Sequence, residues 1–204
     1  MDRRPLKTRS KAWVPVVARA LVKAGLTPNQ VSLLSIGCAI LAGVAFYFSR
    51  CSPFLLLAAA VGIQLRLLCN LLDGVMAVEG GLKSKTGDLY NDIPDRFADV
   101  AILVGAGYGV GYGAIGWIAA LLAVMTAYLR LLGGALGLPQ DFCGPCAKPH
   151  RMFWMTVGAL GGFVEALVSH HDFVLVAALI WVAIGTAITC VRRTLRLVRA
   201  MEAR

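Results

Sequence analysis

The chain has 204 residues, of which 58% are hydrophobic and only 15% are charged. A water-soluble domain usually has about 45–50% apolar and about 25% charged residues, so this composition excludes that class and indicates an integral membrane protein with a single domain, residues 1–204. The net charge of +9 is concentrated near the two ends, as in anchors to anionic lipid headgroups, and the scarcity of basic residues elsewhere argues against nucleic acid as a partner.

The segment from Arg9 to Lys23 is predicted to form an amphipathic helix that lies in the membrane interface. Apolar residues recur there at helical spacing among basic ones, which is typical of interfacial helices. Pro28 and Asn29 then predict a break before the first long apolar segment. We therefore divide the chain into a cytoplasmic or interfacial leader, residues 1–29, and a helical bundle, residues 30–204.

Six apolar segments follow, each of about the 17–25 residues that a helix needs to cross a bilayer. Lys and Arg are concentrated in the termini and in alternate loops, so the positive-inside rule places both termini in the cytoplasm. The predicted fold class is an all-α integral membrane protein, a bundle of six transmembrane helices preceded by the interfacial helix, in the cytoplasmic membrane if the cell is bacterial. The segments are Val31–Phe48, Phe54–Ala77, Leu89–Tyr108, Ala114–Leu136, Met152–Ser169 and Phe173–Val191.

The second segment ends in a polar stripe, although a central Asp costs a membrane helix roughly 2.5–3.5 kcal/mol. Asn70, Asp73, Gly74 and Ala77 are spaced so that they share one helix face, with Arg66 one turn earlier. Ionisable groups inside a membrane segment usually have a function, so this stripe is predicted to form part of a site at the cytoplasmic surface.

The third segment opens with a matching stripe. Asp88, Asn91, Asp95 and Asp99 recur at helical spacing, with Asp92 beside them. Two antiparallel neighbours joined by a short loop would bring the two stripes together. Clustered carboxylates repel one another unless a cation or a proton neutralises them, and hard oxygen ligands suit Mg²⁺ or Mn²⁺. The stripes therefore predict a divalent-metal site that attracts a phosphate-bearing substrate.

Pro94, within the second of these stripes, allows two local structures. It either kinks a continuous helix and leaves the carbonyl of Tyr90 without its hydrogen bond, or it lies in the first turn of a helix that Asn91 or Asp92 caps.

Cations from the fourth segment and the loop after it are expected on the same side of the membrane as the acidic stripes. These are Arg130, Lys148 and Arg151. A cationic pocket beside a metal–diphosphate site suits an anionic acceptor such as a phosphorylated alcohol. Alternatively, the positive-inside rule alone accounts for these cations.

The sequence "CGPC", Cys143 to Cys146, is not predicted to be a redox site. A C-x-x-C motif indicates thioredoxin-like chemistry only near a βαβ pattern, and this chain has none. A zinc site would need two further ligands, and only His150 is close in the sequence.

The two stripes together resemble the motif of the CDP-alcohol phosphotransferase family, D-x2-D-G-x2-A-R-x8-G-x3-D-x3-D. The six-segment layout, the amphipathic leader and "LTPNQVSLLSI" before the first segment are also similar to that family, which favours a continuous, kinked third helix. In the same register, without a gap, this chain has Asn70, Asp73, Gly74, Ala77, Val78, Gly87, Asn91 and Asp95.

The resemblance implies a reaction of phospholipid biosynthesis. An acceptor alcohol attacks the phosphorus of a CDP-linked donor, usually CDP-diacylglycerol, and CMP leaves, with Mg²⁺ or Mn²⁺ as cofactor. By position, Asp95 is implied as the general base. The implied metal ligands are Asp73, Asn70 and Asn91, with Asp92 as a substitute ligand, and the implied CDP-binding residues are Asp73, Gly74, Ala77 and Gly87.

Three positions depart from the family motif: Asn70 and Asn91 replace its first and third aspartates, and Val78 replaces its arginine. Because those two carboxylates are shared between two metals in the family, their replacement removes two negative charges, and a two-metal site is no longer implied. One alternative is a catalytically impaired homologue that binds lipid or nucleotide without turnover. A cation transporter is a further alternative, although the acidic residues gather on one side of the membrane. The expected partners are CDP-diacylglycerol, an acceptor alcohol and membrane lipids. Glycine-rich faces such as "GAGYGVGYG" also permit the close helix contact of a homodimer.

Overall fold

The computed structural model describes residues 13–79, 81, 86–169 and 171–203, and the regular elements in these ranges are all α-helices. The predicted all-α class is therefore confirmed for the described chain. The first residues of the expected leader helix, 9–12, lie outside the described ranges. The helices are α1 (Trp13–Lys23), α2 (Pro28–Tyr47), α3 (Phe54–Glu79), α4 (Gly87–Gly109), α5 (Gly113–Ala135), α6 (Lys148–Val168) and α7 (Phe173–Glu202).

Five of these helices, α2, α3, α5, α6 and α7, are long and apolar enough to cross a membrane. The chain is therefore an integral membrane protein by the length and composition of its helices. Helix α4 has a similar length of 23 residues but carries the acidic stripe, so the sixth crossing stays a prediction.

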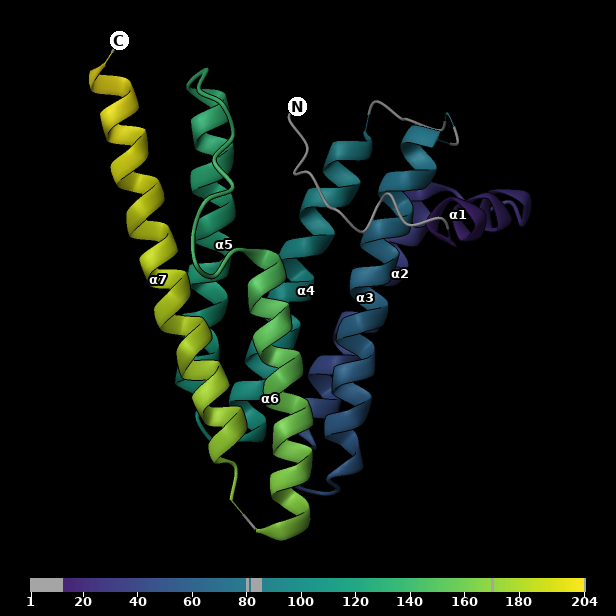
Figure 1. The fold of residues 1–204 in the computed structure, drawn as a ribbon, viewed down its shortest axis with the longest axis vertical. Coiled ribbons are helices and arrows are strands. Elements are labelled where there is room, and N and C mark those ends of the chain that lie inside the picture. Colours follow the sequence, from purple (N-terminus) through teal and green to yellow (C-terminus); the bar gives the residue numbers. More distant parts are fainter. Residues whose placement is uncertain (1–12, 80, 82–85, 170, 204) are drawn as a thin grey trace.

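The helices α2 to α7 form a bundle whose connections alternate between two ends (Figure 1). The C-terminal ends of α3, α5 and α7 and the start of α4 lie at one end, and α1 lies across the bundle near that end. Helix α6 begins only about midway along its neighbours. The first residues of α6 therefore lie deep among the other helices rather than at the end of the bundle.

The start of α2 is set by a capping box. The Thr27 hydroxyl accepts a hydrogen bond from the Gln30 amide at 3.3 Å, and the Thr27 amide donates to the Gln30 side chain at 2.9 Å. Pro28 occupies the first turn, where its missing N–H costs nothing. A break is therefore present, but it lies between Lys23 and Pro28, and Pro28 and Asn29, where it was predicted, belong to the first turn of α2.

Helix α2 packs against both α3 and α4, whereas α3 and α4 make few direct backbone contacts with each other. The expectation that α3 and α4 are close neighbours is thus met only where long polar side chains bridge them. Helix α4 runs without interruption through Pro94, which confirms the continuous helix over the capped alternative.

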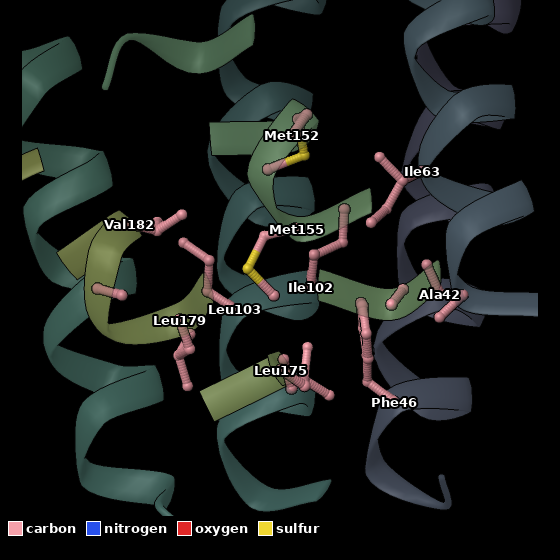
Figure 2. Close-up of a cluster of buried hydrophobic side chains, with 14 of the residues drawn as sticks. Ala42, Phe46, Ile63, Ile102, Leu103, Met152, Met155, Leu175, Leu179 and Val182 are labelled. Atoms are coloured by element: carbon pink, nitrogen blue, oxygen red, sulfur yellow. The ribbon is translucent and has the colours of Figure 1, made fainter. Parts of the chain in front are cut away.

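The larger of the two hydrophobic clusters in the described chain lies in the half of the bundle away from the α3–α4 connection (Figure 2). Figure 2 shows Phe46 of α2, Ile63 of α3 and Leu103 of α4 gathered around the methionines of α6. Met152 and Met155 are fully buried, and such flexible side chains fill irregular gaps between helices. This packing fixes α6 against α3 and α7 and so fixes the depth at which α6 begins.

The glycine-rich face of α4 is used within the chain. A Cβ added at Gly105 would lie 2.2 Å from the carbonyl oxygen of Gly43 in α2, and one at Gly107 would lie 2.7 Å from Gly116 in α5. The backbones approach closely at these points, as small residues allow. A homodimer stays a prediction, and this face is not free to form it.

Gly105→Ala is expected to lower the free energy of unfolding by about 1–3 kcal/mol, because the added methyl group overpacks the α2–α4 contact. Thermal unfolding in detergent micelles measures the change. Gly37→Ala is the matched control, since a Cβ at Gly37 of α2 meets no atom within 4 Å. Equal unfolding temperatures for the two variants would contradict the close helix contact.

Candidate functional site

The two predicted polar stripes meet between α3 and α4. The Asn70 side-chain amide of α3 donates a hydrogen bond to Asp95 Oδ1 of α4 at 2.9 Å. Arg66, one turn before Asn70, donates from Nη2 to the backbone carbonyl of Asp95 at 3.3 Å. The helical spacing of the stripes therefore translates into direct contact.

Asp99 is the centre of a buried ion-pair network. Its Oδ1 accepts from Arg66 Nη2 at 2.7 Å, and its Oδ2 accepts from Arg151 Nη2 of α6 at 2.6 Å. The Arg66 side chain is 0% exposed, and those of Asp99 and Arg151 are 1% exposed. Charges buried this deeply require partners, so Asp99 joins α3, α4 and α6 through its two arginines.

Asp95 lies one helical turn before Asp99 in α4 and is surrounded by cations. Lys148 of α6 forms an ion pair with Asp95 Oδ1, and Arg66 Nη2 lies 3.5 Å from the same oxygen. Arg96 Nη2 lies 3.7 Å from Oδ2. The predicted general base thus lies beside a predicted acceptor-binding lysine.

Asp73 has a different environment from the other site carboxylates. Its side chain faces α2, where Ser32 Oγ donates to Oδ2 at 2.5 Å. Asp73 is only 3% exposed, and its Oδ1 has no hydrogen-bond partner among the described residues. A buried carboxylate oxygen without a donor is costly, so this atom is suited to a ligand that brings positive charge.

Asp92 accepts a hydrogen bond from Arg130 of α5. The Arg130 guanidinium also lies over the Phe142 ring, 5.5 Å from its centroid, and is partly exposed. This side chain is therefore both held in place and accessible, as an anion-binding group requires.

Arg151, predicted to bind the acceptor, is held by buried partners. Besides Asp99, it donates to the Cys146 carbonyl at 2.9 Å and to Thr126 Oγ1 at 3.3 Å. Its guanidinium is enclosed in the described structure, so it positions Asp99 and the loop before α6. Lys148 and Arg130 are brought to the site instead, with 25% and 20% of their side chains exposed.

The "CGPC" loop is anchored to α7. Arg193 donates to the Cys143 carbonyl at 3.0 Å, and the Cys146 amide donates to Thr189 Oγ1 at 3.1 Å. Both cysteines are free thiols. Burial raises the pKa of the Cys146 thiol, and the two contacts to α7 give the loop a structural role.

The remaining motif positions differ in burial. Gly74 is buried, Ala77, Gly87 and Asn91 are half-buried, and Val78 is 64% exposed. At the position of the family arginine this chain thus presents an exposed apolar side chain. The side chain of Asp88, part of the predicted stripe, lies outside the described part of the structure.

Sequence reasoning missed three side chains that shape the site. Arg96 approaches Asp95, and Arg193 donates to the loop before α6. Ser32, which donates to Asp73, was the easiest of the three to identify from the sequence, because it is a polar residue within an apolar segment. None of these contacts is visible in the spacing of the motif.

The carboxylates of the site differ in how well they suit a divalent metal ion. Among the described residues, no three His, Cys, Asp or Glu side chains lie close enough together to hold a metal ion. Asp73, with its unpartnered oxygen, fits one hard cation. Asp95 does not fit one, because cations and the Asn70 amide already occupy it.

Curated relatives of the chain are phosphatidylinositol phosphate synthases. The chain is 28% identical to the one from Mycobacteroides abscessus over 72% of this chain and 69% of that protein. It is 29% identical to the one from Mycobacterium tuberculosis over 87% of this chain and 82% of that protein. An archaetidylinositol phosphate synthase from Pyrococcus horikoshii is 27% identical over 60% of this chain and 62% of that protein. No family model matches the chain.

Solved structures share the fold. The Mycobacterium tuberculosis phosphatidylinositol phosphate synthase with CDP-DAG bound has a TM-score of 0.76 at 23% identity, over 90% of this chain and 92% of that chain. The same synthase in complex with manganese and citrate has a TM-score of 0.77 at 23% identity, over 90% of this chain and 88% of that one. These likenesses show a common arrangement of helices along nearly the whole chain.

Proposed function

We propose, from the premise that the chain belongs to the CDP-alcohol phosphotransferase family, that it transfers a phosphatidyl group from CDP-diacylglycerol to an acceptor alcohol and releases CMP. The convergence of two motif acids with cations from other helices carries the proposal. Asp73 and Asp95 keep their register in the motif, and Lys148 meets Asp95 from α6. Such a reaction is a step of phospholipid biosynthesis.

Asp95 is proposed as the general base. The acceptor hydroxyl gives its proton to the Asp95 carboxylate as its oxygen forms the new bond to phosphorus, and the bond to CMP breaks with the electron pair leaving on CMP. The Asn70 amide donates to the Asp95 carboxylate, and Arg66 Nη2 lies 3.5 Å from the same oxygen, which keeps the base oriented before substrate binds. A bound divalent ion would neutralise the diphosphate and the charge that develops on CMP.

The CDP moiety is proposed to bind along the α3 face that begins at Asp73. Gly74 and Ala77 continue that face at helical spacing, and Gly87 is the first residue of α4. Small residues allow a flat base to approach the backbone. Asp73 would hold the divalent ion, and Asn70, Asn91 and Asp92 are available as neutral or secondary oxygen donors around it.

The proposed topology places the site at the cytoplasmic surface of a single domain. With α4 as the sixth crossing, the even number of spans puts α1 and the end of α7 on one side, as Figure 1 shows for the bundle. Helix α1 lies across the bundle axis, the orientation of an interfacial helix. The basic ends of the chain face the cytoplasm in this arrangement.

The acceptor is proposed to be a phosphorylated alcohol of the inositol phosphate class. Arg130 and Lys148 are the partly exposed cations beside Asp95 and Asp92, and they suit a phosphate group. The curated relatives named above are synthases of inositol phosphate lipids, which supports the same class here.

CMP release from CDP-diacylglycerol tests the function and the acceptor class together. With purified protein and Mn²⁺, inositol phosphate is expected to support CMP release at least about 10-fold faster than inositol, since one charge-assisted contact is worth about 1.5–3 kcal/mol. Glycerol phosphate and glycerol form a second matched pair. No CMP release with any acceptor would contradict the function, and equal rates within both pairs would contradict the phosphorylated acceptor.

A catalytically impaired homologue is the second candidate, and the two asparagines favour it. The double variant Asn70→Asp/Asn91→Asp separates the two readings. Turnover that rises from zero to a measurable rate would identify an impaired site, whereas turnover that falls would mean that the asparagines suit this chain's own chemistry.

A further inference from the structure

The charges of the site are almost balanced before any metal binds. The described carboxylates are Asp73, Asp92, Asp95 and Asp99, and the cations within 4 Å of one or more of them are Arg66, Arg96, Arg130, Lys148 and Arg151. Asn70 and Asn91 add no charge. A cluster whose side-chain cations outnumber its carboxylates by one does not need two divalent ions to relieve repulsion.

The Oδ1 atom of Asp95 is already surrounded by positively charged groups and a hydrogen-bond donor. It is shared by the Lys148 ammonium, the Asn70 N–H donor and Arg66 Nη2 at 3.5 Å. An ion with two positive charges at the same oxygen would meet the full repulsion of these cations. The neighbours of Asp95 therefore neutralise its carboxylate charge, as a bound metal ion would.

Asp73 shows the opposite pattern. No ion pair within the described chain reaches it, and the side-chain hydrogen bond to its Oδ2 comes from the neutral Ser32 hydroxyl. Its Oδ1 is buried and accepts no hydrogen bond from a described side chain. This oxygen is a hard, anionic ligand in the position where positive charge is lacking.

We infer that the chain binds one divalent cation, at Asp73, and that the Lys148 ammonium takes the place of a second cation beside Asp95. In this arrangement amides stand at two positions where the family motif has carboxylates, and the single positive charge of Lys148 stands beside Asp95 in place of a dication. The inference rests on the proposed function for its purpose, but it concerns metal binding alone.

Mn²⁺ binding to the full-length protein in detergent, without substrate, tests this by electron paramagnetic resonance of free and bound Mn²⁺. One Mn²⁺ per chain is expected. Asp73→Asn is expected to weaken binding at least 10-fold, whereas Asp172→Asn, at the opposite end of the bundle, leaves it unchanged. The triple variant Asn70→Asp/Asn91→Asp/Lys148→Met is expected to bind a second Mn²⁺.

Two Mn²⁺ per wild-type chain would overturn the inference, as would the absence of Mn²⁺ binding. One bound Mn²⁺ would also overturn it if its affinity is the same in Asp73→Asn as in the wild type. The number of Mn²⁺ ions bound per wild-type chain tests the inference even if a variant does not fold. The outcomes also separate the two proposals: two bound Mn²⁺ with normal CMP release contradict only the inference, and one Mn²⁺ at Asp73 without CMP release contradicts only the proposed function.

Discussion

CMP release is expected to fall by about 100- to 10,000-fold when Asp95 is replaced by Asn, the range that a general base contributes to catalysis. The amide keeps the size of the side chain and can still accept from the Asn70 N–H, but it cannot take a proton from the acceptor hydroxyl. Initial rates of CMP release with saturating CDP-diacylglycerol and acceptor measure the loss. The donor KM is expected to change little, because Asp95 acts on the acceptor.

Asp172→Asn is the matched control for this variant. Asp172 is also an aspartate in an ion pair, with Arg50 at 3.3 Å, but the pair is largely exposed and lies at the opposite end of the bundle from the site. Its CMP release is expected to equal that of the wild type. An Asp95→Asn protein that unfolds at the wild-type temperature and retains more than about a tenth of the activity is not consistent with a general base.

Asp99→Asn is expected to lower the free energy of unfolding by about 3–5 kcal/mol, the cost of breaking a buried ion pair from one side. The change leaves the buried guanidinium groups of Arg66 and Arg151 without a full counter-charge. Thermal unfolding in micelles, followed by circular dichroism, measures the loss. Asp172→Asn should cost less than about 1 kcal/mol, as exposed pairs do.

A double-mutant cycle separates the pair from its surroundings. Arg66→Met leaves Asp99 paired with Arg151 alone, and Asp99→Leu leaves both arginines without this counter-charge, whereas the double variant removes both charges of the Arg66–Asp99 pair. The double variant is expected to be more stable than the sum of the two single losses predicts, by at least about 1 kcal/mol. Strict additivity would show that Arg66 and Asp99 do not act as a buried pair.

Local periodicity in the sequence predicted most of the helices well. The second segment, Phe54–Ala77, corresponds to α3 at Phe54–Glu79, and the fourth, Ala114–Leu136, to α5 at Gly113–Ala135. Apolar length is a local property, so these boundaries follow from composition alone. The spacing of the two polar stripes was also readable, because residues three and four apart share a helix face.

The two helices that frame the site were predicted less well. Helix α6 begins at Lys148 rather than Met152, and α7 continues to Glu202 rather than ending at Val191. Hydropathy marks where the apolar stretch ends, but a helix continues wherever its backbone hydrogen bonds do. The extra turn of α6 carries Lys148, and the extra turns of α7 carry Arg193, so the error fell on residues that shape the site.

The sequence by itself therefore determined an all-helical membrane chain and two facing polar stripes in the register of a known motif. Only the tertiary structure decided which charges meet. Lys148 reaches Asp95, and Ser32 reaches Asp73, because the packing of α2, α4 and α6 sets the relative heights and angles of the helices. Helical periodicity places a side chain on a face, but the partner across that face belongs to another helix, distant in the chain, whose position depends on every contact in the bundle.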